Sequence, residues 1–277
     1  MKSFPEKNMG MPMKAINLSL LIVLSIPAFA QKSDDSSNNL LPKNYWGFSI
    51  IPSLTAKTEI DGDKNRYQLH SHPKFGAELL IHYHINFRKN YALVFSIGKN
   101  AFGSKLHYTI PKEMLDPPTG SNITPNKFGS RGMEIINYKV QAELMRRWPG
   151  NKAHNWNLGT GLSLLMSFDG GGGTTWYLVD YPSGQTKQYL TRYQQNDNNR
   201  KPWFNFHIAG GHEWTLKSKD ILQINLKVNY SPINPSTGTY LFTTGVQPDL
   251  SGQYGVSGSY IGISIGYIVS RGSKKLK

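Results

Sequence analysis

The residues of this sequence that could carry chemistry are polar side chains that alternate with apolar ones. Glu78, His82 and His84 occupy even positions between residues 75 and 87, so on an extended strand they share one face. Two histidines two residues apart on a strand can chelate Zn²⁺, and an imidazole can also transfer a proton. A third ligand at a recognisable spacing does not accompany them. The pattern therefore favours a hydrogen-bonded polar cluster over a metal or proton site.

Three further motifs are weaker candidates. His70 and His72 form a second His-x-His pair with the same lack of a third ligand. The four glycines at residues 170–173 are not followed by the Gly-Lys-Ser or Gly-Lys-Thr of a phosphate-binding loop. His212 is a candidate for lipid-modifying chemistry, but its place two residues before Trp214 is typical of a polar tip beside interfacial aromatic rings. We predict no catalytic residue, no cofactor and no bound metal.

A period of two in hydrophobicity predicts the elements that hold these residues. Between residues 75 and 87 every odd position is apolar, and the even positions are mostly polar or glycine. No stretch after residue 40 offers eighteen consecutive apolar residues, and no convincing helical stripe appears. The same alternation recurs and predicts eight strands, at approximately residues 46–52, 75–87, 91–97, 136–148, 156–166, 204–214, 222–230 and 261–269.

The connections between these strands alternate between short and long. Strands two and three, four and five, and six and seven are joined by short turns. The long connections span residues 55–72, 103–132, 169–201 and 231–259. With both termini at the short-turn end, this is the plan of an outer-membrane barrel, whose turns are periplasmic and whose loops are extracellular. The predicted fold class is all-β, a closed antiparallel transmembrane β-barrel of about eight strands, which leaves no edge exposed to lipid.

Aromatic residues beside the predicted short turns favour a membrane barrel. Each falls on the apolar side of its strand, and such rings gather where a bilayer meets water. The predicted interfacial girdle comprises Trp46, Phe87, Tyr91, Trp148, Trp156, Trp214 and Tyr267. A soluble, lipocalin-like barrel with its apolar side chains packed inward is the alternative. Loop asymmetry, the girdle and an export signal favour the membrane barrel.

The polar side of each strand then faces the barrel interior. The predicted interior cluster comprises Glu78, His82, His84, Lys139, Glu143, His207, Glu213 and Lys227. An eight-stranded barrel is only wide enough for side chains to fill, so these charges must pair, and we expect a plugged interior. Each charge should find a partner on a neighbouring strand, and His82 and Lys227 are candidate partners of Glu143, with the register between strands left open.

The third long connection contains a further hairpin. Residues 176–179 and 188–193 flank the turn Pro182-Ser183-Gly184. If this hairpin spans the bilayer, the barrel has ten strands. Lys187 and Arg192 favour eight strands and a hairpin outside the membrane, where it offers a surface for recognition.

The N-terminus has the order of a secretory signal peptide. Lys14 precedes an apolar run at residues 15–27, and Ala28-Phe29-Ala30 has the small-x-small pattern of a cleavage site. We predict cleavage after Ala30, and an uncleaved anchor is the alternative. The predicted organisation is a signal peptide (residues 1–30), a polar linker (31–44), the barrel (45–270) and a basic C-terminal tail (271–277).

Charge and cysteine content exclude some classes of function. The chain has no Cys, which excludes disulfides and thiolate sites, and it has 31 basic against 17 acidic residues. Many basic residues gather at the short-turn end: Arg88, Lys89, Arg146, Arg147, Lys152, Lys217, Lys219, Arg271, Lys274, Lys275 and Lys277. They indicate either a solvated rim or attraction to anionic headgroups or a periplasmic partner. We expect no nucleic-acid partner, because an exported barrel offers no accessible basic groove.

On these patterns, residues 45–270 resemble the small outer-membrane β-barrel proteins of Gram-negative bacteria, of the porin-family or outer-membrane β-barrel domain type. The resemblance implies a location in the cell outer membrane after signal-peptide cleavage and contact with outer-membrane lipid. Such proteins often end on an aromatic residue, whereas here Tyr267 is followed by residues 268–277. We expect a structural or surface-interaction protein whose long loops contact an extracellular ligand or protein. A small passive channel and a lipid-modifying enzyme are the alternatives.

Overall fold

Every regular element in the described part of the chain is a β-strand. The computed structural model describes residues 44–62, 69–88, 90–107, 133–150, 154–167, 172–180, 186–195, 201–243 and 250–269. The predicted signal peptide and basic tail, and the predicted linker before Asn44, lie outside these residues. Among the described residues no helix is long and apolar enough to cross a membrane.

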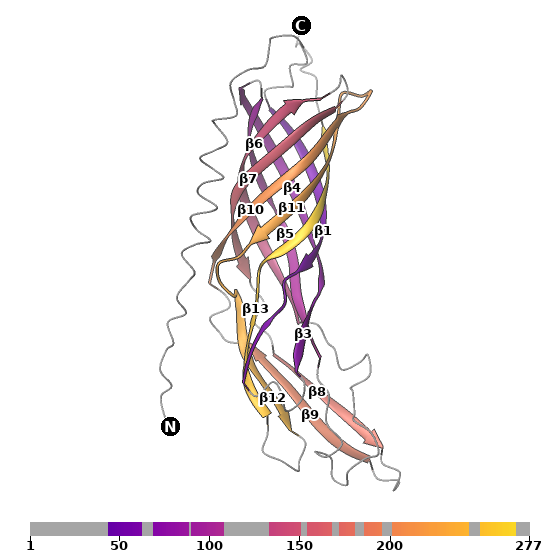
Figure 1. Cartoon of the computed structure of the whole chain (residues 1–277), viewed down its shortest axis with the longest axis vertical. Coiled ribbons are helices and arrows are strands. Elements are labelled where there is room, and N and C mark those ends of the chain that lie inside the picture. The colour runs from indigo at the N-terminus through magenta and orange to yellow at the C-terminus, as the bar shows by residue number, and fades with distance from the viewer. Residues whose placement is uncertain are drawn as a thin grey trace. The chain divides into compact units, whose positions relative to one another are not determined.

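Eight strands close into a barrel, which confirms the predicted fold class. They are β1 (Asn44–Thr55), β4 (Phe75–Arg88), β5 (Tyr91–His107), β6 (Met133–Pro149), β7 (His154–Ser167), β10 (Trp203–Thr215), β11 (Ile221–Tyr230) and β14 (Tyr260–Val269). Their order is β5-β4-β1-β14-β11-β10-β7-β6, and pairing of β5 with β6 closes the ring. All eight pairings are antiparallel. Figure 1 shows β7, β10 and β11 side by side and tilted relative to the long axis of the barrel.

The alternation of side chains is regular, and its direction excludes the lipocalin-like alternative. Along β1 and β11 buried and exposed residues alternate almost without interruption. Apolar side chains point outward, and Phe48 and Ile97 are 57% and 60% exposed. Polar side chains point inward, and Lys139 and Asn205 are fully buried. A barrel wall that is apolar outside and polar inside is typical of a transmembrane barrel, because the apolar outer surface is stable in contact with the hydrocarbon of a bilayer.

The three short connections lie at one end of the barrel, as predicted. Between β10 and β11 the chain turns through Leu216 and Asp220, with backbone hydrogen bonds Leu216 N to Asp220 O (2.8 Å) and Lys219 N to Leu216 O (2.9 Å). Lys219 has a positive φ of 69°, a conformation that tight turns demand. Both ends of the described barrel, Asn44 and Val269, lie at this same end, since Trp46 pairs with Val269.

The long connections contribute a second sheet of five strands. In order across the sheet these are β2 (Glu59–Gly62), β13 (Leu250–Val256), β12 (Ser236–Thr243), β9 (Thr186–Gln195) and β8 (Gly172–Asp180). The β8–β9 pair is the hairpin predicted in the third long connection. It joins this sheet and not the barrel, so the barrel has eight strands and not ten.

Three strands of the second sheet, β2, β12 and β13, were not predicted. The fourth long connection was interpreted as a loop, but β12 and β13 pair there over seven residue pairs. Their sequences are rich in Ser, Thr and Gly, which weakens the alternating signal of a strand. Hydrogen bonding of β12 with β9 and of β13 with β2 stabilises these two strands, which the local sequence does not indicate. A short strand, β3 (His70–Pro73), was also missed, and it pairs with the far end of β5.

Candidate functional site: the polar lumen

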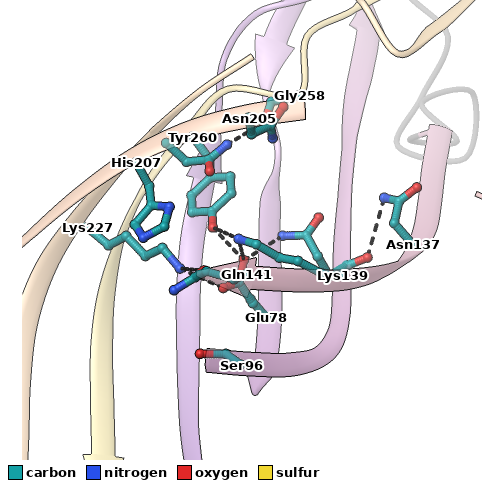
Figure 2. Close-up of polar contacts among 12 residues, drawn as sticks. Glu78, Ser96, Asn137, Lys139, Gln141, Asn205, His207, Lys227, Gly258 and Tyr260 are labelled. Carbon is teal, nitrogen blue, oxygen red and sulfur yellow. Dashed lines mark hydrogen bonds and ion pairs between the residues drawn. The ribbon is translucent and has the colours of Figure 1, made fainter. Parts of the chain in front are cut away.

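Glu78 is the centre of the larger polar network inside the barrel. Its side chain is fully buried, and its two oxygens contact different cations: Lys227 Nζ lies 2.8 Å from Oε1, and Lys139 Nζ lies 2.9 Å from Oε2. Asn100 and the hydroxyl of Tyr260 also donate to Oε2. Figure 2 shows Lys139, Lys227 and Tyr260 converging on this carboxylate. One side chain thus links β4, β5, β6, β11 and β14.

The network continues from Lys227 along a chain of hydrogen bonds. Lys227 Nζ also donates to Gln141 Oε1 at 2.9 Å, and Gln141 Nε2 donates to Glu143 Oε2 at 3.2 Å. His207 Nε2 lies 3.0 Å from the same oxygen of Glu143. Two buried carboxylates are therefore connected through a lysine and an amide.

Inward glycines on β7 make room for Glu143 and His207. The register pairs His207 with Gly161 and Gly161 with Glu143, so the two side chains meet across a residue that has none. A Cβ atom added to Gly161 would lie 2.7 Å from Cε1 of His207. One added to Gly159 would lie 2.0 Å from Oε1 of Glu143. Both distances are shorter than real Cβ contacts, so a side chain at either position would force Glu143 or His207 to shift.

The predicted partner of Glu143 was wrong. Its direct ionisable partner is His207, not His82 or Lys227. Lys227 instead contacts Glu78, and His82 contacts Ser96. The alternation of residues decides which side chains face the lumen, but the stagger between strands decides which of them meet.

A second network lies nearer the short turns and is centred on Arg147. Its Nε donates to Glu213 Oε2 at 2.7 Å, its Nη1 donates to Asn86 Oδ1 at 3.0 Å, and its Nη2 donates to the hydroxyl of Tyr45. Gln223 Nε2 donates to the other oxygen of Glu213 at 3.1 Å. Three of the five guanidinium hydrogens thus have partners, in the geometry that suits this planar group.

Two residues assigned to the basic rim are not solvated there. Arg147 points into the lumen and is 4% exposed. Arg146 takes the outward parity but is only 8% exposed, and its guanidinium carbon lies 5.7 Å and 4.7 Å from the ring centroids of Tyr91 and Trp148. Both positions correct the expectation of a uniform charged rim. Strand β6 extends to Pro149, so the alternation continues through both arginines.

His82 and His84 lie between the two networks. His82 Nδ1 is 2.9 Å from Ser96 Oγ, and the ring of His84 stacks on Tyr45 with centroids 4.5 Å apart. The two imidazole centroids are 5.9 Å apart. Across the described ranges, no group of three or more His, Asp or Glu side chains is arranged to hold a metal ion. His70 and His72 contact each other on β3, with ring centroids 4.9 Å apart.

One cavity in the lumen, lined by described residues, is small. A cavity of about 30 Å³ is lined by residues of both networks, among them His82, His84, Glu143 and Lys227. A water molecule needs roughly 10–15 Å³ of such volume, so the cavity suits about two waters. Buried atoms without a partner, such as Nε2 of His82 and Oδ1 of Asn225, are suited to bind them.

The charges of the lumen balance within the described part of the barrel. Three buried carboxylates (Glu78, Glu143 and Glu213) lie among three buried basic side chains (Lys139, Arg147 and Lys227). A buried charge is tolerated when it is paired and hydrogen-bonded, and each of these six is. The arrangement can hold strands together across the lumen.

All eight residues of the predicted interior cluster lie in the lumen and are at most 9% exposed. Sequence reasoning missed several of their partners. Tyr45 and Tyr260 fall just outside the strands that the alternation indicated, yet β1 begins at Asn44 and β14 at Tyr260. Extending the alternation of each strand by one or two residues would have placed both hydroxyls inside.

The predicted girdle residues point outward near the short turns. The phenyl ring of Phe87 lies 6.2 Å from the ring of Tyr91, and Trp46 packs on Tyr83 at 4.7 Å. His212 lies between two indoles, with its ring centroid 3.5 Å from that of Trp156 and 5.5 Å from that of Trp214. The seven residues are Trp46, Phe87, Tyr91, Trp148, Trp156, Trp214 and Tyr267.

No protein-family model matches the chain, and no curated protein matches it. Among solved structures, the chain is similar to Neisserial surface protein A, at 13% identity over 84% of this chain and 99% of that one, with a TM-score of 0.37. It is also similar to the outer membrane protein AlkL in DMPC lipid bilayers, at 15% identity over 87% and 97% of the two chains, with a TM-score of 0.40. The β domain of the Bordetella autotransporter BrkA is more distant, at 9% identity over 82% and 98%, with a TM-score of 0.22. The fold assignment rests on the strand pairing itself.

Proposed function

We propose that this protein is a non-enzymatic barrel of the outer membrane with a plugged lumen, and that its long connections form a surface for interaction with an extracellular ligand or protein. The observation that carries the closed lumen is the network around Glu78. This one carboxylate binds two lysines that come from β6 and β11. Opening the lumen would separate these charges inside a low-dielectric interior, which is costly.

The location is supported by the outer wall. Apolar side chains face outward along the barrel strands, and Leu79, Leu226 and Ile263 are each more than half exposed. Strands that carry such a band with aromatic rings at its edge are the form in which sheets cross bilayers. The predicted signal peptide would deliver the chain to that membrane.

The interaction role is supported by the order within the long connections. Three of the four contribute strands to one sheet: β2 from the first, β8 and β9 from the third, and β12 and β13 from the fourth. The sheet has its own contacts, such as the hydroxyl of Tyr240 on the carbonyl of Asp61 (2.8 Å) and Asn234 Nδ2 on Glu59 Oε2 (2.7 Å). Loops held by a rigid scaffold are the common place for recognition.

Ion conductance in planar bilayers tests the closed lumen. We expect no steady single-channel currents from the unmodified protein. A variant that removes the charges of both networks, Glu78→Ala, Lys139→Ala and Lys227→Ala together with Arg147→Ala and Glu213→Ala, should conduct if it still folds, which heat-modifiable migration on gels can check. Steady currents from the unmodified protein would replace the plug with the passive channel.

Accessible tags test the direction of insertion. A tag near Gly184 or Gly120, in long connections, should be reached by antibody on intact cells, and a tag at Asn151 in a short turn should not. Equal labelling of all three sites would contradict the proposed topology.

A further inference from the structure

The pairing of β3 with the far end of β5 brings three histidines to one place in the fold. His70 and His72 are two residues apart on β3, so they share one face of that strand. The register of the two strands sets His70 directly opposite His107 of β5. Residues directly opposite each other in an antiparallel pair take the same face of the sheet. The backbone therefore assigns all three histidines to one face of the β3–β5 ladder.

His107 is the third ligand that the His-x-His pair lacks in the sequence. It lies in a different long connection, so no spacing along the chain relates it to His70 and His72. The structure describes the backbone of His107 and not its side chain. The register alone therefore assigns its face, and the absence of a metal-binding group of three residues holds only for the described side chains.

The rings of His70 and His72 have the spacing of two ligands of one ion. Residues two apart on a strand lie roughly 6.6 Å apart along it. The two ring centroids are only 4.9 Å apart, with the ring planes inclined at 68°, so the rings lean toward each other. Two imidazoles that bind one Zn²⁺ at a tetrahedral angle, with Zn–N distances of about 2.0–2.1 Å, have centroids roughly 5 Å apart. The pair therefore needs little rearrangement to chelate an ion.

Strand β3 is anchored on its other face and at its end. Ser71 lies between the two histidines of β3, and its hydroxyl donates to the carbonyl oxygen of Thr58 at 2.8 Å. Just after β3, Thr55 N donates to Lys74 O at 3.0 Å, and Thr55 Oγ1 donates to Gly103 O at 2.7 Å. These bonds fix β3 against β1 and β5 before any ion binds. Preorganisation of this kind lowers the entropic cost of binding.

The histidines lie beyond the hydrocarbon and are open to water. A strand crosses a bilayer in about 9–11 residues. Counted from Tyr91 at the short-turn end, β5 therefore leaves the hydrocarbon near Ala101, well before His107. His70 and His72 are exposed. An ion can enter from solvent, and water can take the position that three protein ligands leave open in a four-coordinate site.

The ligand type and the local charge decide which ions fit. Imidazole nitrogen suits Zn²⁺, Cu²⁺ and Ni²⁺, whereas Mg²⁺ and Ca²⁺ prefer oxygen ligands. Lys105 takes the register position opposite His72. A lysine there opposes a bound cation, although a lysine stem is long enough to keep its charge in water. Removing this charge should therefore not weaken binding.

We propose that the positions of His70, His72 and His107 form a binding site for a divalent transition-metal ion, with Zn²⁺ as the best match. The ion ties the first long connection, which contains β3, to the start of the second, which begins on β5. The site goes beyond the proposed function, since it depends neither on a closed lumen nor on what the long connections recognise.

Calorimetric titration of Zn²⁺ into the purified full chain, in detergent and without a polyhistidine tag, tests the site. We expect one Zn²⁺ per chain. His70→Gln, His72→Gln and His107→Gln should each weaken binding at least about tenfold, because loss of a group that only supports a ligand already costs that much. Heat-modifiable migration on gels checks that each variant still forms the barrel.

Two matched controls separate the site from general binding to histidine or to the surface. Lys105→Met, at the position opposite His72, should bind Zn²⁺ at least as tightly as the unmodified chain. His212→Gln should leave the affinity unchanged. His212 also lies beside a second histidine, with ring centroids 6.0 Å apart, but on another part of the wall.

Three results would overturn the proposal. They are no saturable Zn²⁺ binding by the unmodified chain, unchanged affinity in His107→Gln, and an equal loss of affinity in His212→Gln and His72→Gln. Should His107→Gln fail to fold, the comparison of His72→Gln with Lys105→Met decides, since these residues oppose each other in the register. The titration is made in detergent and does not depend on conductance or on the direction of insertion, so this proposal and the proposed function can fail separately.

Discussion

The lumen and the outer wall are built from the same eight strands, yet they follow opposite rules. On β6, Lys139 is fully buried, while its neighbours Tyr138 and Val140 are 46% and 50% exposed. In a soluble barrel the apolar neighbours would be inside. Alternation therefore defines two faces, and the surrounding medium decides which face turns inward.

The two faces also differ in how a substitution should act on them. In the lumen each charge is withdrawn from water and depends on a named partner, so removing one charge leaves another uncompensated. On the outer wall no partner is needed, because the lipid covers apolar side chains wherever they lie. Damage there should come from adding a charge and not from removing a contact.

Glu78→Ala is expected to have the largest effect. It leaves Lys139 and Lys227 buried without their shared carboxylate, at a cost of about 3–5 kcal/mol in the free energy of unfolding. Urea unfolding of the barrel in detergent or vesicles measures this. Adding Lys139→Met to the variant should restore part of the loss. A loss below about 1 kcal/mol would contradict the paired lumen.

Leu226→Arg tests the outer wall, and its expected loss in the free energy of unfolding is slightly smaller than that of Glu78→Ala. Leu226 points outward from the middle of β11, and a cation near the bilayer midplane costs about 2–4 kcal/mol. The neighbouring residue Asn225 points inward, so the effect of Asn225→Arg on the free energy of unfolding should depend instead on local packing and charge. Unfolding from vesicles compares the two. If Leu226→Arg has no effect, the outer wall does not face hydrocarbon.

Glu143→Ala tests which ionisable side chain pairs with Glu143 in the lumen. Its partner is His207, which can become neutral, so the expected loss is about 1–3 kcal/mol and smaller than for Glu78→Ala. In a double-mutant cycle the effect should shrink when His207→Ala is also present. If it shrinks with His82→Ala and not with His207→Ala, the observed pairing is wrong.

The smallest expected effect on stability comes from replacing two glycines, one on the inward face of the barrel and one on the outward face. Gly159→Ala would place a Cβ against Glu143 and should cost about 1–3 kcal/mol. Gly210→Ala points outward, where the nearest atom is a flexible Leu158 methyl at 3.2 Å, and it should be neutral or stabilise the strand by up to about 1 kcal/mol. Thermal unfolding in detergent ranks the pair. Equal losses would mean that the inward face at Gly159 is no more crowded than the outward face at Gly210.

The fold was predictable to a large degree because its signals are local. The period of two along residues 75–87 and 222–230 marks the faces of β4 and β11 without knowledge of any partner. Connection lengths then indicate which ends of the strands lie together. The five-stranded sheet was less predictable, because β12 and β13 carry little alternation and gain their order from β9 and β2.

The candidate site was predictable only as a list of inward residues. The alternation of inward and outward residues places Glu78, Glu143 and Lys227 in the lumen, but it does not predict which of them are in contact. Arg147 illustrates the same limit, since it was assigned to the rim although the alternation of β6 continues through it. Extending the alternation two residues beyond Met145 would have identified Arg147 as an inward residue that could meet Glu213.

The amino-acid sequence alone was enough to specify eight strands, their two faces and the ends at which they join, because each of these depends on neighbours along the chain. The contacts of the lumen depended on tertiary structure. Glu78 meets Lys139 and Lys227 from 61 and 149 residues away, and Glu143 meets His207 across Gly161. These meetings are decided by the stagger of strands around a closed ring, a quantity that no single strand encodes.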